Sequence, residues 1–508
     1  MAVDTDVCAL AKMPKRHIAI HGKKILHIMK KVCALGPRIM CDVGVAAWVL
    51  DPTTREPNLI GLVQKYLSDE PATIKEAAQF LFQLASRMEQ ELRLNSLDKI
   101  FYEMEMPLLP VLVHMEEKGV LLDRGVLHMF SEILEKRLRE REEKIYELAG
   151  CHFNINSPKQ LTEVLFEKLG IAQDGIRKTD GGVRSTRASE LAKLGLTHPI
   201  AKEVLMYREE MKLKSTYVDV LPTLVNSETG KIHTTFNQTG TVTGRLSSQD
   251  PNLQNIPIRT SLGQEIRRAF VASPGYELLS FDYSQIELRL AASLSGDERM
   301  IEAFRTGKDI HTMTAALVGG VEENSVTPIM RRAAKTINFG ILYGMGAMSL
   351  AENLGISHKE ADTFIREYFM QFPHIKTYLE ETKRKAAEQG YVETLFGRRR
   401  YFKNISQLGW QARREAERMA INAPIQGSDA DIVKTAMIRI FHELKDGFLC
   451  DEVRMLLQVH DELLFEVRTE KRGAYADKIR FLMETIVHLQ TPLTVEVRWG
   501  ANWYELMK

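Results

Sequence analysis

The chain has 508 residues, too many for one compact core, so we expect roughly two to four subdomains. Its formal net charge is +1, so composition does not indicate nucleic-acid binding, and any such surface has to be local. No apolar run is long enough to span a bilayer and the first residues lack a signal-peptide core, so we expect an intracellular protein without a membrane partner. The scattered cysteines form no CxxC pair, which excludes a zinc site or disulfide framework and indicates buried thiols in a reducing compartment. They are Cys8, Cys33, Cys41, Cys151 and Cys450.

The first 100 residues alternate short apolar runs with helical stretches, as in RIMCDVGVAAWVLDP and IKEAAQFLFQLASRMEQELRL. They contain no convergent set of carboxylates, so we predict a small structural α/β module. Long helices follow, because LDRGVLHMFSEILEKRLREREEKIYELAG has apolar residues at three- and four-residue spacing, typical of an extended helical arm. Residues 175–189, GIRKTDGGVRSTRAS, are basic and glycine-rich without an apolar anchor. They predict a mobile tip, which suits gripping a phosphate backbone but equally a plain surface loop.

A polar stretch at 234–260 is dense in Asn, Gln, Ser, Thr and Gly, and long loops of this kind are uncommon without a function. Its amides and hydroxyls, with Arg245 and Arg259, can bind sugar and phosphate oxygens, although a turn-rich connector is the alternative. The next stretch, YELLSFDYSQIELRLAASLSG, predicts a strand at 277–281 and then a helix. Asp282 therefore ends a strand, where α/β sites usually collect, and Glu287 follows in the helix.

The stretch TPIMRRAAKTINFGILYGMG at 327–346 predicts a helix that begins at its Thr-Pro pair. Each step of four residues advances about 40° around the helix axis and about 6 Å along it. Four side chains at this spacing form one stripe, with two cations near the helix start and two aromatic rings beyond. A nucleoside triphosphate, anionic at one end and flat at the other, would fit this stripe, whereas a plain basic amphipathic helix is the alternative. The four are Arg331, Lys335, Phe339 and Tyr343.

Three further segments complete the chain. GRRRYF predicts a basic turn, and the helix after it carries a polar stripe at Arg418, Asn422 and Gln426, with Pro424 inside expected to bend or break it. MLLQVHDELLFEV predicts two apolar strands with His460-Asp461-Glu462 at the tip of their hairpin, although Asp is also an ordinary turn former. TPLTVEVRWGANWYELMK predicts a last strand and an aromatic tail.

Together, these segments predict one type of reaction. Asp282 and Asp461, at the ends of separate strands, can share two Mg²⁺ ions if the strands are neighbours, because Mg²⁺ takes few protein oxygens. The Arg331–Lys335 helix would supply cations for a triphosphate, and the two rings would meet the base. The Walker A sequence is absent, which disfavours a P-loop ATPase. The residues therefore predict a nucleotidyl transferase that acts on nucleic acid.

The stretches FDYSQIELR, RRAAKTINFGILYG and VHDEL resemble motifs A, B and C of the family A (DNA polymerase I-like) DNA polymerases, in the right order. TVTGRLSSQDPNLQNIP and AINAPIQGSDADI are also similar to that family, and the match runs from about residue 102 to the C-terminus. The resemblance implies a multidomain α/β fold: a right hand with an antiparallel palm sheet, helical fingers and thumb, and a truncated exonuclease-like module. The implied domains are 1–101 (inactive exonuclease-like module), 102–221 (thumb), 222–297 (palm, motif A), 298–417 (fingers, motif B) and 418–508 (palm, motif C).

The resemblance also implies the activity: template-directed DNA synthesis in replication or repair, with dNTPs added to a primer 3′-OH and pyrophosphate released. Primer–template DNA and dNTPs are the implied partners, two Mg²⁺ ions the cofactor, with Mn²⁺ able to substitute, and the enzyme is a monomer. Carried over residue by residue, Asp282, Asp461 and the Tyr283 carbonyl hold the metals, with Glu462 as a nearby acid. Arg331, Lys335 and His311 contact the triphosphate, and Lys335 also protonates the pyrophosphate. Phe339 and Tyr343 pack at the nascent base pair, while Glu287, with Gln285 beside it, excludes a 2′-hydroxyl. The implied DNA contacts are Arg245, Arg418, Asn422, Gln426 and His460, besides Arg259 from the polar stretch.

Two departures from the family pattern qualify these expectations. The upstream module is short and has no carboxylates where the proofreading acids would fall, around HGKKILHIM and AQFLFQLAS, so we expect no 3′–5′ exonuclease activity. A 5′-nuclease domain is also absent, as in a natural short form or a large fragment. A single-subunit RNA polymerase shares the palm and the Arg-x3-Lys helix, but Glu287, Phe339 and Glu462 favour the DNA enzyme. A DNA-binding scaffold without catalysis is disfavoured because every motif acid and cation is present.

Overall fold

A computed structural model describes residues 17–20, 22–24, 26–27, 39–54, 57–171, 184–258 and 260–507, and they form a mixed α/β protein. The chain folds as two compact units, each built from separate stretches of sequence. Unit 1 comprises Met1–Lys118, Thr235–Asp250 and Leu279–Arg498, and unit 2 comprises Gly119–Thr234, Pro251–Leu278 and Trp499–Lys508. The division into five domains expected from the sequence stays a prediction.

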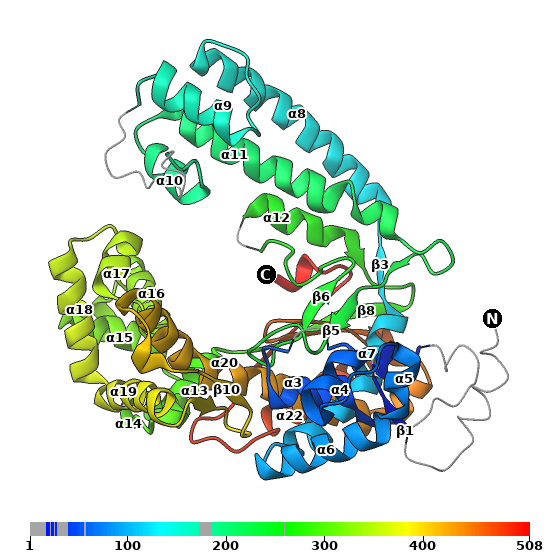
Figure 1. Cartoon of the computed structure of the whole chain (residues 1–508). Coiled ribbons are helices and arrows are strands. Elements are labelled where there is room, and N and C mark those ends of the chain that lie inside the picture. Colours follow the sequence, from blue (N-terminus) through cyan, green and yellow to red (C-terminus); the bar gives the residue numbers. More distant parts are fainter. Residues whose placement is uncertain are drawn as a thin grey trace. The chain divides into compact units, whose positions relative to one another are not determined.

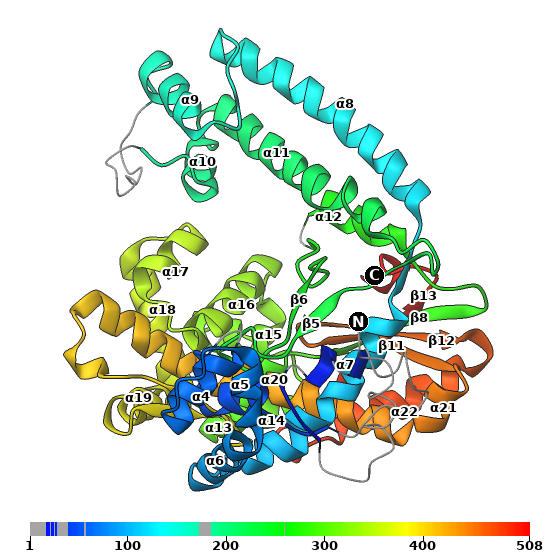
Figure 2. The same ribbon diagram turned by 45° about the vertical axis from the view of Figure 1, so that its right-hand side comes forward.

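Unit 2 is dominated by two long packed helices, α8 (Arg124–Ala149) and α11 (Pro199–Leu213), which lie side by side in Figures 1 and 2. The Asp123 side chain caps the start of α8, and Gly150 ends it in the left-handed region at φ 63°. Both helices contribute to one apolar core, and the arm predicted from the apolar spacing is thereby confirmed. A small sheet, ordered β4-β3-β7, completes the unit with β3 (Val120–Leu122), β4 (Lys231–Ile232) and β7 (Phe270–Val271).

The shorter elements of unit 2 include α9 (Pro158–Thr162), α10 (Ala188–Leu194) and α12 (Ser261–Ile266). Of the basic stretch at 175–189, the part up to 183 lies outside the described residues. The described part is packed, because Ser185 and Thr186 are buried and the Thr186 carbonyl accepts a hydrogen bond from Arg208 at 2.6 Å. The expectation of a mobile tip is therefore wrong for residues 184–189, where the half-buried Arg208 supplies the anchor that apolar residues do not.

A four-stranded sheet, ordered β11-β12-β8-β13, lies mostly in unit 1. Its strands are β8 (Tyr276–Tyr283), β11 (Val453–Val459), β12 (Glu462–Arg468) and β13 (Val495–Gly500). β11 and β12 form the antiparallel hairpin that the sequence predicts, and the predicted strands at 277–281 and at the C-terminus are also confirmed. The core of the sheet is apolar and aromatic, with the rings of Phe281 and Phe465 edge to face at 5.4 Å.

Helix α20 (Trp410–Glu443) is the longest described element of unit 1. It packs against α7 (Met106–Lys118), α13 (Ile286–Ser295) and α22 (Arg472–Glu484). Pro424 lies inside α20 without ending it, so the predicted break is wrong and only a bend remains of that expectation. The proline removes one backbone donor, and burial of Ile421, Ile425 and Ile432 outweighs that loss. The short helix α21 (Lys445–Leu449) follows α20.

Seven helices connect β8 to the β9–β10 hairpin. They are α13 (Ile286–Ser295), α14 (Glu298–Arg305), α15 (Ile310–Gly319), α16 (Pro328–Leu342), α17 (Ala347–Leu354), α18 (His358–Gln371) and α19 (Pro373–Glu388). Helix α16 begins as predicted, because the Thr327 side chain accepts a hydrogen bond from the Met330 N–H. It packs against α15 and α17, which positions its cationic stripe.

The N-terminal part of unit 1 is the α/β module that the sequence predicts. β1 (His17–Ala19) pairs in parallel with β2 (Ile39–Asp42), and the Asp42 carboxylate caps the start of α3 (Val43–Leu50). The module continues with α4 (Leu59–Leu67), α5 (Ile74–Gln79) and α6 (Leu81–Leu94), and a π-helical turn (Ile100–Glu105) leads into α7. The Trp48 side chain is fully buried in it.

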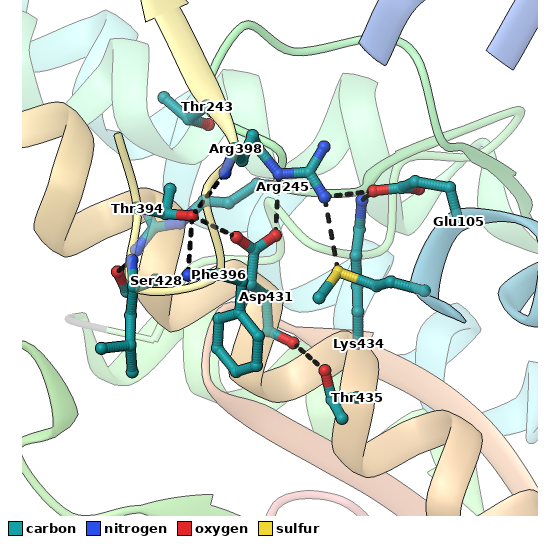
Figure 3. Close-up of polar contacts among 12 residues, drawn as sticks. Glu105, Thr243, Arg245, Thr394, Phe396, Arg398, Ser428, Asp431, Lys434 and Thr435 are labelled. Atoms are coloured by element: carbon teal, nitrogen blue, oxygen red, sulfur yellow. Dashed lines mark hydrogen bonds and ion pairs between the residues drawn. The ribbon is translucent and has the colours of Figure 1, made fainter. Parts of the chain in front are cut away.

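Two stretches that the sequence assigned to loop or turn are hairpins. The polar segment contains β5 (Thr235–Asn237) paired with β6 (Ser247–Gln249). The predicted basic turn at 397–402 contains β10 (Arg399–Tyr401), which pairs with β9 (Tyr391–Glu393). Arg398 is not a surface cation, because buried carboxylates hold it (Figure 3). Its Nε lies 2.7 Å from Asp431, another of its nitrogens contacts Glu105, and Lys434 lies 2.8 Å from Glu105.

The described cysteines differ in their exposure to solvent. Cys41 is buried as expected, Cys151 is half-buried and Cys450 is exposed, so the expectation of buried thiols is wrong for Cys450, which follows the short surface helix α21. Cys8 and Cys33 lie outside the described residues. None of the helices in the described ranges is long and apolar enough to cross a membrane.

Candidate active site

The two carboxylates that the sequence singled out lie close together in unit 1. Asp282 is the penultimate residue of β8, and Asp461 lies in the turn between β11 and β12. The backbone N–H of Tyr283 donates to the Asp461 carbonyl at 3.3 Å, which ties the end of β8 to that turn. Glu462, the first residue of β12, accepts a hydrogen bond from Ser280 Oγ at 2.7 Å. The structure therefore brings the three predicted acids to one edge of the sheet.

The electrostatics of this edge are those of crowded negative charge. The pKa of Asp282 is raised to about 8, first by enclosure within the protein, although the side chain reaches solvent, and then by the charges of Asp461 and Glu462. Burial also raises the pKa of Asp461 to about 6, with the Glu287 charge adding to the effect and Arg245 opposing it. A cation placed between carboxylates that repel each other in this way strongly stabilises their ionised form.

A divalent cation fits this donor set. No group of three or more His, Cys, Asp or Glu side chains in the described ranges is arranged to hold a metal, so side chains alone do not complete a shell. Two carboxylates with a backbone carbonyl do suit Mg²⁺, which keeps several waters and substrate oxygens in its shell. Asp282, Asp461 and the carbonyl of Tyr283 would be its ligands, as the sequence predicts.

Helix α16 presents the predicted cations to solvent. Arg331 and Lys335 are both exposed, so each is accessible to an anionic ligand. Arg331 Nη2 lies 2.7 Å from the carboxylate of Asp309, which also caps the start of α15. An anion that binds Arg331 has to compete with Asp309 for it. Breaking this half-exposed ion pair costs little free energy.

His311 is the one predicted triphosphate contact that is not exposed. It is 2% exposed and lies between α15 and α16, with its Nδ1 3.0 Å from Asn338 Nδ2 and its ring centroid 5.9 Å from that of Phe339. The pKa of His311 is lowered to about 4, mainly by burial and also by the charges of Lys335 and Arg331, against the opposing effect of Asp309. The imidazole is therefore neutral at pH 7 and acts here as a packing and hydrogen-bonding group.

The aromatic end of the α16 stripe contacts Glu287, whose charge acts on Asp461. Phe339 is half-buried, and Tyr343 caps the end of α16 with its hydroxyl donating to Glu287 Oε2. Gly344 follows in the left-handed region at φ 69°, and a Cβ there would lie 2.9 Å from Ile421 Cδ1. The end of α16 thus packs directly against α20, on the turn that carries Arg418.

The polar stripe of α20 faces this junction. Arg418 is exposed, whereas Asn422 and Gln426 are half-buried, and the Gln426 side chain interacts with the Tyr343 hydroxyl. Asn422 Oδ1 is buried without a hydrogen-bond partner among the described residues. The structure therefore brings together the predicted DNA contacts of α20 and the predicted base-pair ring of α16.

The remaining predicted contacts fall into three cases. His460 is exposed in the hairpin turn with φ 58°, and its carbonyl accepts a hydrogen bond from Gln458. Gln285 caps α13 in the left-handed region at φ 53°, beside Glu287, and its buried Oε1 has no partner within the described ranges. Arg259 lies outside the described residues.

Arg245 is held by two carboxylates, and one of them was missed from the sequence. Its Nη2 donates to Glu287 Oε1 at 2.9 Å and to Asp429 Oδ2 at 2.7 Å. Asp429 lies on α20 and is 2% exposed. The spacing of Asp429 could have identified it from the sequence. Asp429 follows Asn422 by seven residues and so continues the polar stripe of α20 into an otherwise apolar face.

Comparison with known proteins agrees with this geometry. The DNA polymerase family A model matches residues 124–505. The chain is 47% identical over 467 residues to DNA polymerase I, thermostable, of Thermus aquaticus, covering 91% of this chain and 55% of that protein. It is 45% identical over 469 residues to DNA polymerase I of Caldicellulosiruptor bescii, again covering 91% of this chain and 55% of that protein. The chain thus spans about half the length of the curated relatives it matches.

A solved structure shows the same architecture. The POL domain of Pol1 from M. smegmatis, in complex with DNA primer-template and dNTP, superposes with a TM-score of 0.92 at 38% identity. The match covers 99% of this chain and 88% of that one. The fold is therefore that of a polymerase domain, which confirms the fold class expected from the sequence. The chain belongs to DNA polymerase family A, as its three motifs indicated.

Proposed function

We propose that this chain is a DNA-directed DNA polymerase that adds dNTPs to the 3′-OH of a primer and releases pyrophosphate. The observation that carries the proposal is the meeting of Asp282 and Asp461 at one sheet edge, with raised pKa values and Glu287 close enough to raise that of Asp461. Membership of family A and the likeness to a domain bound to DNA primer-template and dNTP support it. Primer–template DNA and dNTPs are the proposed partners of this chain.

The acids of the sheet edge would hold two Mg²⁺ ions, through Asp282, Asp461 and the Tyr283 carbonyl. Bound there, the ions would activate the attacking hydroxyl and stabilise the leaving pyrophosphate. Glu462 adds negative charge at the same edge but is engaged with Ser280, so its proposed role is to support the site electrostatically. Mn²⁺, with similar oxygen preference, would be able to substitute.

The cations of α16 would bind the triphosphate. Arg331 offers a planar group for bidentate phosphate contact once it leaves Asp309, and exposed Lys335 would protonate the leaving pyrophosphate. Phe339 and Tyr343 would pack at the nascent base pair. Positioning and charge compensation of this kind supply most of the catalysis in phosphoryl transfer.

Glu287 is the proposed barrier to ribonucleotides, with Gln285 beside it. Its carboxylate is fixed on both oxygens, by Arg245 and by Tyr343, so it cannot swing aside easily for an added 2′-hydroxyl. The proposed DNA contacts are Arg245, Arg259, Arg418, Asn422, Gln426 and His460. A template-dependent RNA polymerase is the alternative, and the fixed Glu287 disfavours it.

Primer extension with single nucleotides tests the proposal. On a primer–template with Mg²⁺, we expect the dNTP complementary to the template base to be added, with little addition of the other dNTPs or of the matching rNTP. Omission of the divalent cation should stop extension. Preferential use of rNTPs, or addition that ignores the template base, would contradict the proposal.

The absence of 3′–5′ exonuclease activity stays a prediction. Among the described residues of the N-terminal module, the buried Asp42 carboxylate is engaged by the backbone N–H groups of Gly22, Gly44 and Val45, which leaves it poorly placed to bind a metal. A 3′-mismatched primer incubated with Mg²⁺ and no dNTP should keep its length, and visible trimming would refute the prediction.

A further inference from the structure

Asp429 makes an arrangement at Arg245 that the predicted roles do not explain. A single guanidinium nitrogen, Nη2, donates to carboxylates of two different helices, at 2.7 Å to Asp429 on α20 and at 2.9 Å to Glu287 on α13. The other Glu287 oxygen accepts the Tyr343 hydroxyl at the end of α16. One chain of polar contacts therefore runs from α20 through the segment between β5 and β6 to α13 and α16.

Stability does not explain this chain of contacts, because burying Asp429 at its position destabilises the folded state. Its Oδ1 and the Arg245 Nε are buried without a partner among the residues that the structure describes. A buried unsatisfied polar atom destabilises the folded state. Burial also raises the pKa of Asp429 to about 7, even though Arg245 opposes the shift.

Asp431, two residues further along α20, shows the contrast. Both of its oxygens are bonded, Oδ1 to Arg398 Nε and Oδ2 to Thr394 Oγ1, each at 2.7 Å (Figure 3). Its network also includes Glu105 and Lys434 and, among the described residues, makes no hydrogen bond to Glu287 or Tyr343. Asp431 therefore has the contacts of a structural carboxylate, whereas Asp429 has one partner and that partner leads to Glu287.

We propose that Asp429 is a positioning residue for the sugar pocket. By holding the Arg245 guanidinium it fixes the Glu287 carboxylate, and so it strengthens the choice of dNTP over rNTP. This inference rests on the proposed function, in which Glu287 excludes a 2′-hydroxyl. Without Asp429 the guanidinium is free to turn about its remaining bond, and Glu287 loses a fixed partner on one side. Small displacements of a positioned group have large effects on discrimination at a reacting centre.

The test compares kcat/KM for the matched dNTP and rNTP in single-nucleotide primer extension. Asp429→Asn and Asp429→Ala should each lower the dNTP-to-rNTP ratio by about fivefold or more, mainly through faster rNTP addition. Asp431→Asn is the matched control, since it removes a buried carboxylate of the same helix that does not contact Arg245. It should lower the melting temperature and leave the ratio as in the wild type. Should the alanine variant not fold, the nearly isosteric asparagine variant decides.

A double variant separates this inference from the function on which it rests. Glu287→Ala should itself lower the ratio, and adding Asp429→Ala to it should cause no further change, because Asp429 acts through Glu287. A wild-type ratio in folded Asp429 variants, an equal fall in Asp431→Asn, or additive effects in the double variant would overturn the inference alone. A wild-type ratio in Glu287→Ala would overturn both the proposed role of Glu287 and the inference.

Discussion

At the scale of single residues, the site is defined by polar groups that are buried or crowded at a cost. Asp282 and Asp461 have raised pKa values, and Arg245, Asn422, Gln285 and Asp429 each keep a buried polar atom without a partner within the described residues. Natural proteins leave few such atoms unsatisfied. These four atoms lie on α20, at the start of α13 and in the segment between β5 and β6, where a polar ligand would supply partners.

Phe339 gives the first prediction at this scale. In family A, by the resemblance described above, phenylalanine at this position disfavours chain-terminating dideoxynucleotides. Phe339→Tyr adds a hydroxyl to a half-buried ring beside the proposed sugar position, where it can replace a hydrogen bond that a missing 3′-hydroxyl would make. We expect dideoxynucleotide incorporation relative to dNTP to rise by about tenfold, equivalent to one hydrogen bond of about 1.4 kcal/mol. An unchanged ratio in single-nucleotide competition would mean that α16 does not face the sugar.

His311 gives a prediction for stability against pH. Because the folded pKa is about 4 and the ordinary value is 6.5, the unfolded chain binds a proton first as pH falls. The contribution of neutral His311 is present above pH 6.5 and is lost progressively down to pH 4, by at most about 3 kcal/mol. Asp309, whose pKa is lowered, loses its contribution only at more acidic pH.

The variant His311→Gln, which keeps a polar partner for Asn338, should therefore lose less stability than the wild type between pH 6.5 and pH 4. Denaturant unfolding at several pH values measures this difference. Parallel curves for the two proteins across that window would contradict the burial and the lowered pKa of His311.

At the scale of elements, two contacts hold the site together: α16 ends against α20 at Gly344, and the β9–β10 hairpin is tied to α20 by Arg398. The second contact is the buried network of Arg398, Glu105, Asp431 and Lys434 in Figure 3. Arg398 is 4% exposed, so its charge depends on the two carboxylates that face it. The network anchors the helix from which Asn422 and Gln426 project.

Arg398→Ala should lower the free energy of unfolding by about 3–5 kcal/mol, because it leaves buried carboxylates without their cation. Arg413→Ala, on α20, is the control: its partner Glu417 is one turn away and the arginine is 53% exposed, so we expect a change of at most about 0.5 kcal/mol. Both values come from chemical denaturation. Equal, small effects in the two variants would show that the buried network does not stabilise α20.

Local signals in the sequence were sufficient for the elements and residues that depend on neighbours along the chain. The Thr327 cap, the hairpin around Asp461 and the spacing of Arg331 and Lys335 on α16 could all be predicted, because periodicity and capping are local. Burial was not predictable in the same way. Arg398 was predicted only as part of a basic turn, and Asp429 was not singled out, because the carboxylates and arginine that pair with them lie far away in sequence.

At the scale of the whole molecule, the two acids proposed to bind metal, helix α16 and the polar face of α20 belong to unit 1, which three separate stretches of sequence build. Unit 2 contributes the helical arm of α8 and α11. Membership of family A covers most of the chain, whereas the activity proposed for this chain rests on the acids of one sheet edge.

The most direct measurement is primer extension by Asp461→Asn alongside binding of the same primer–template. The substitution keeps the shape of the side chain and removes one of the two charges proposed to hold Mg²⁺. We expect extension to fall by at least about a thousandfold, while the Kd for the duplex stays within about threefold, because the proposed duplex contacts are made by other residues. Extension at the wild-type rate would contradict the assignment of the catalytic site.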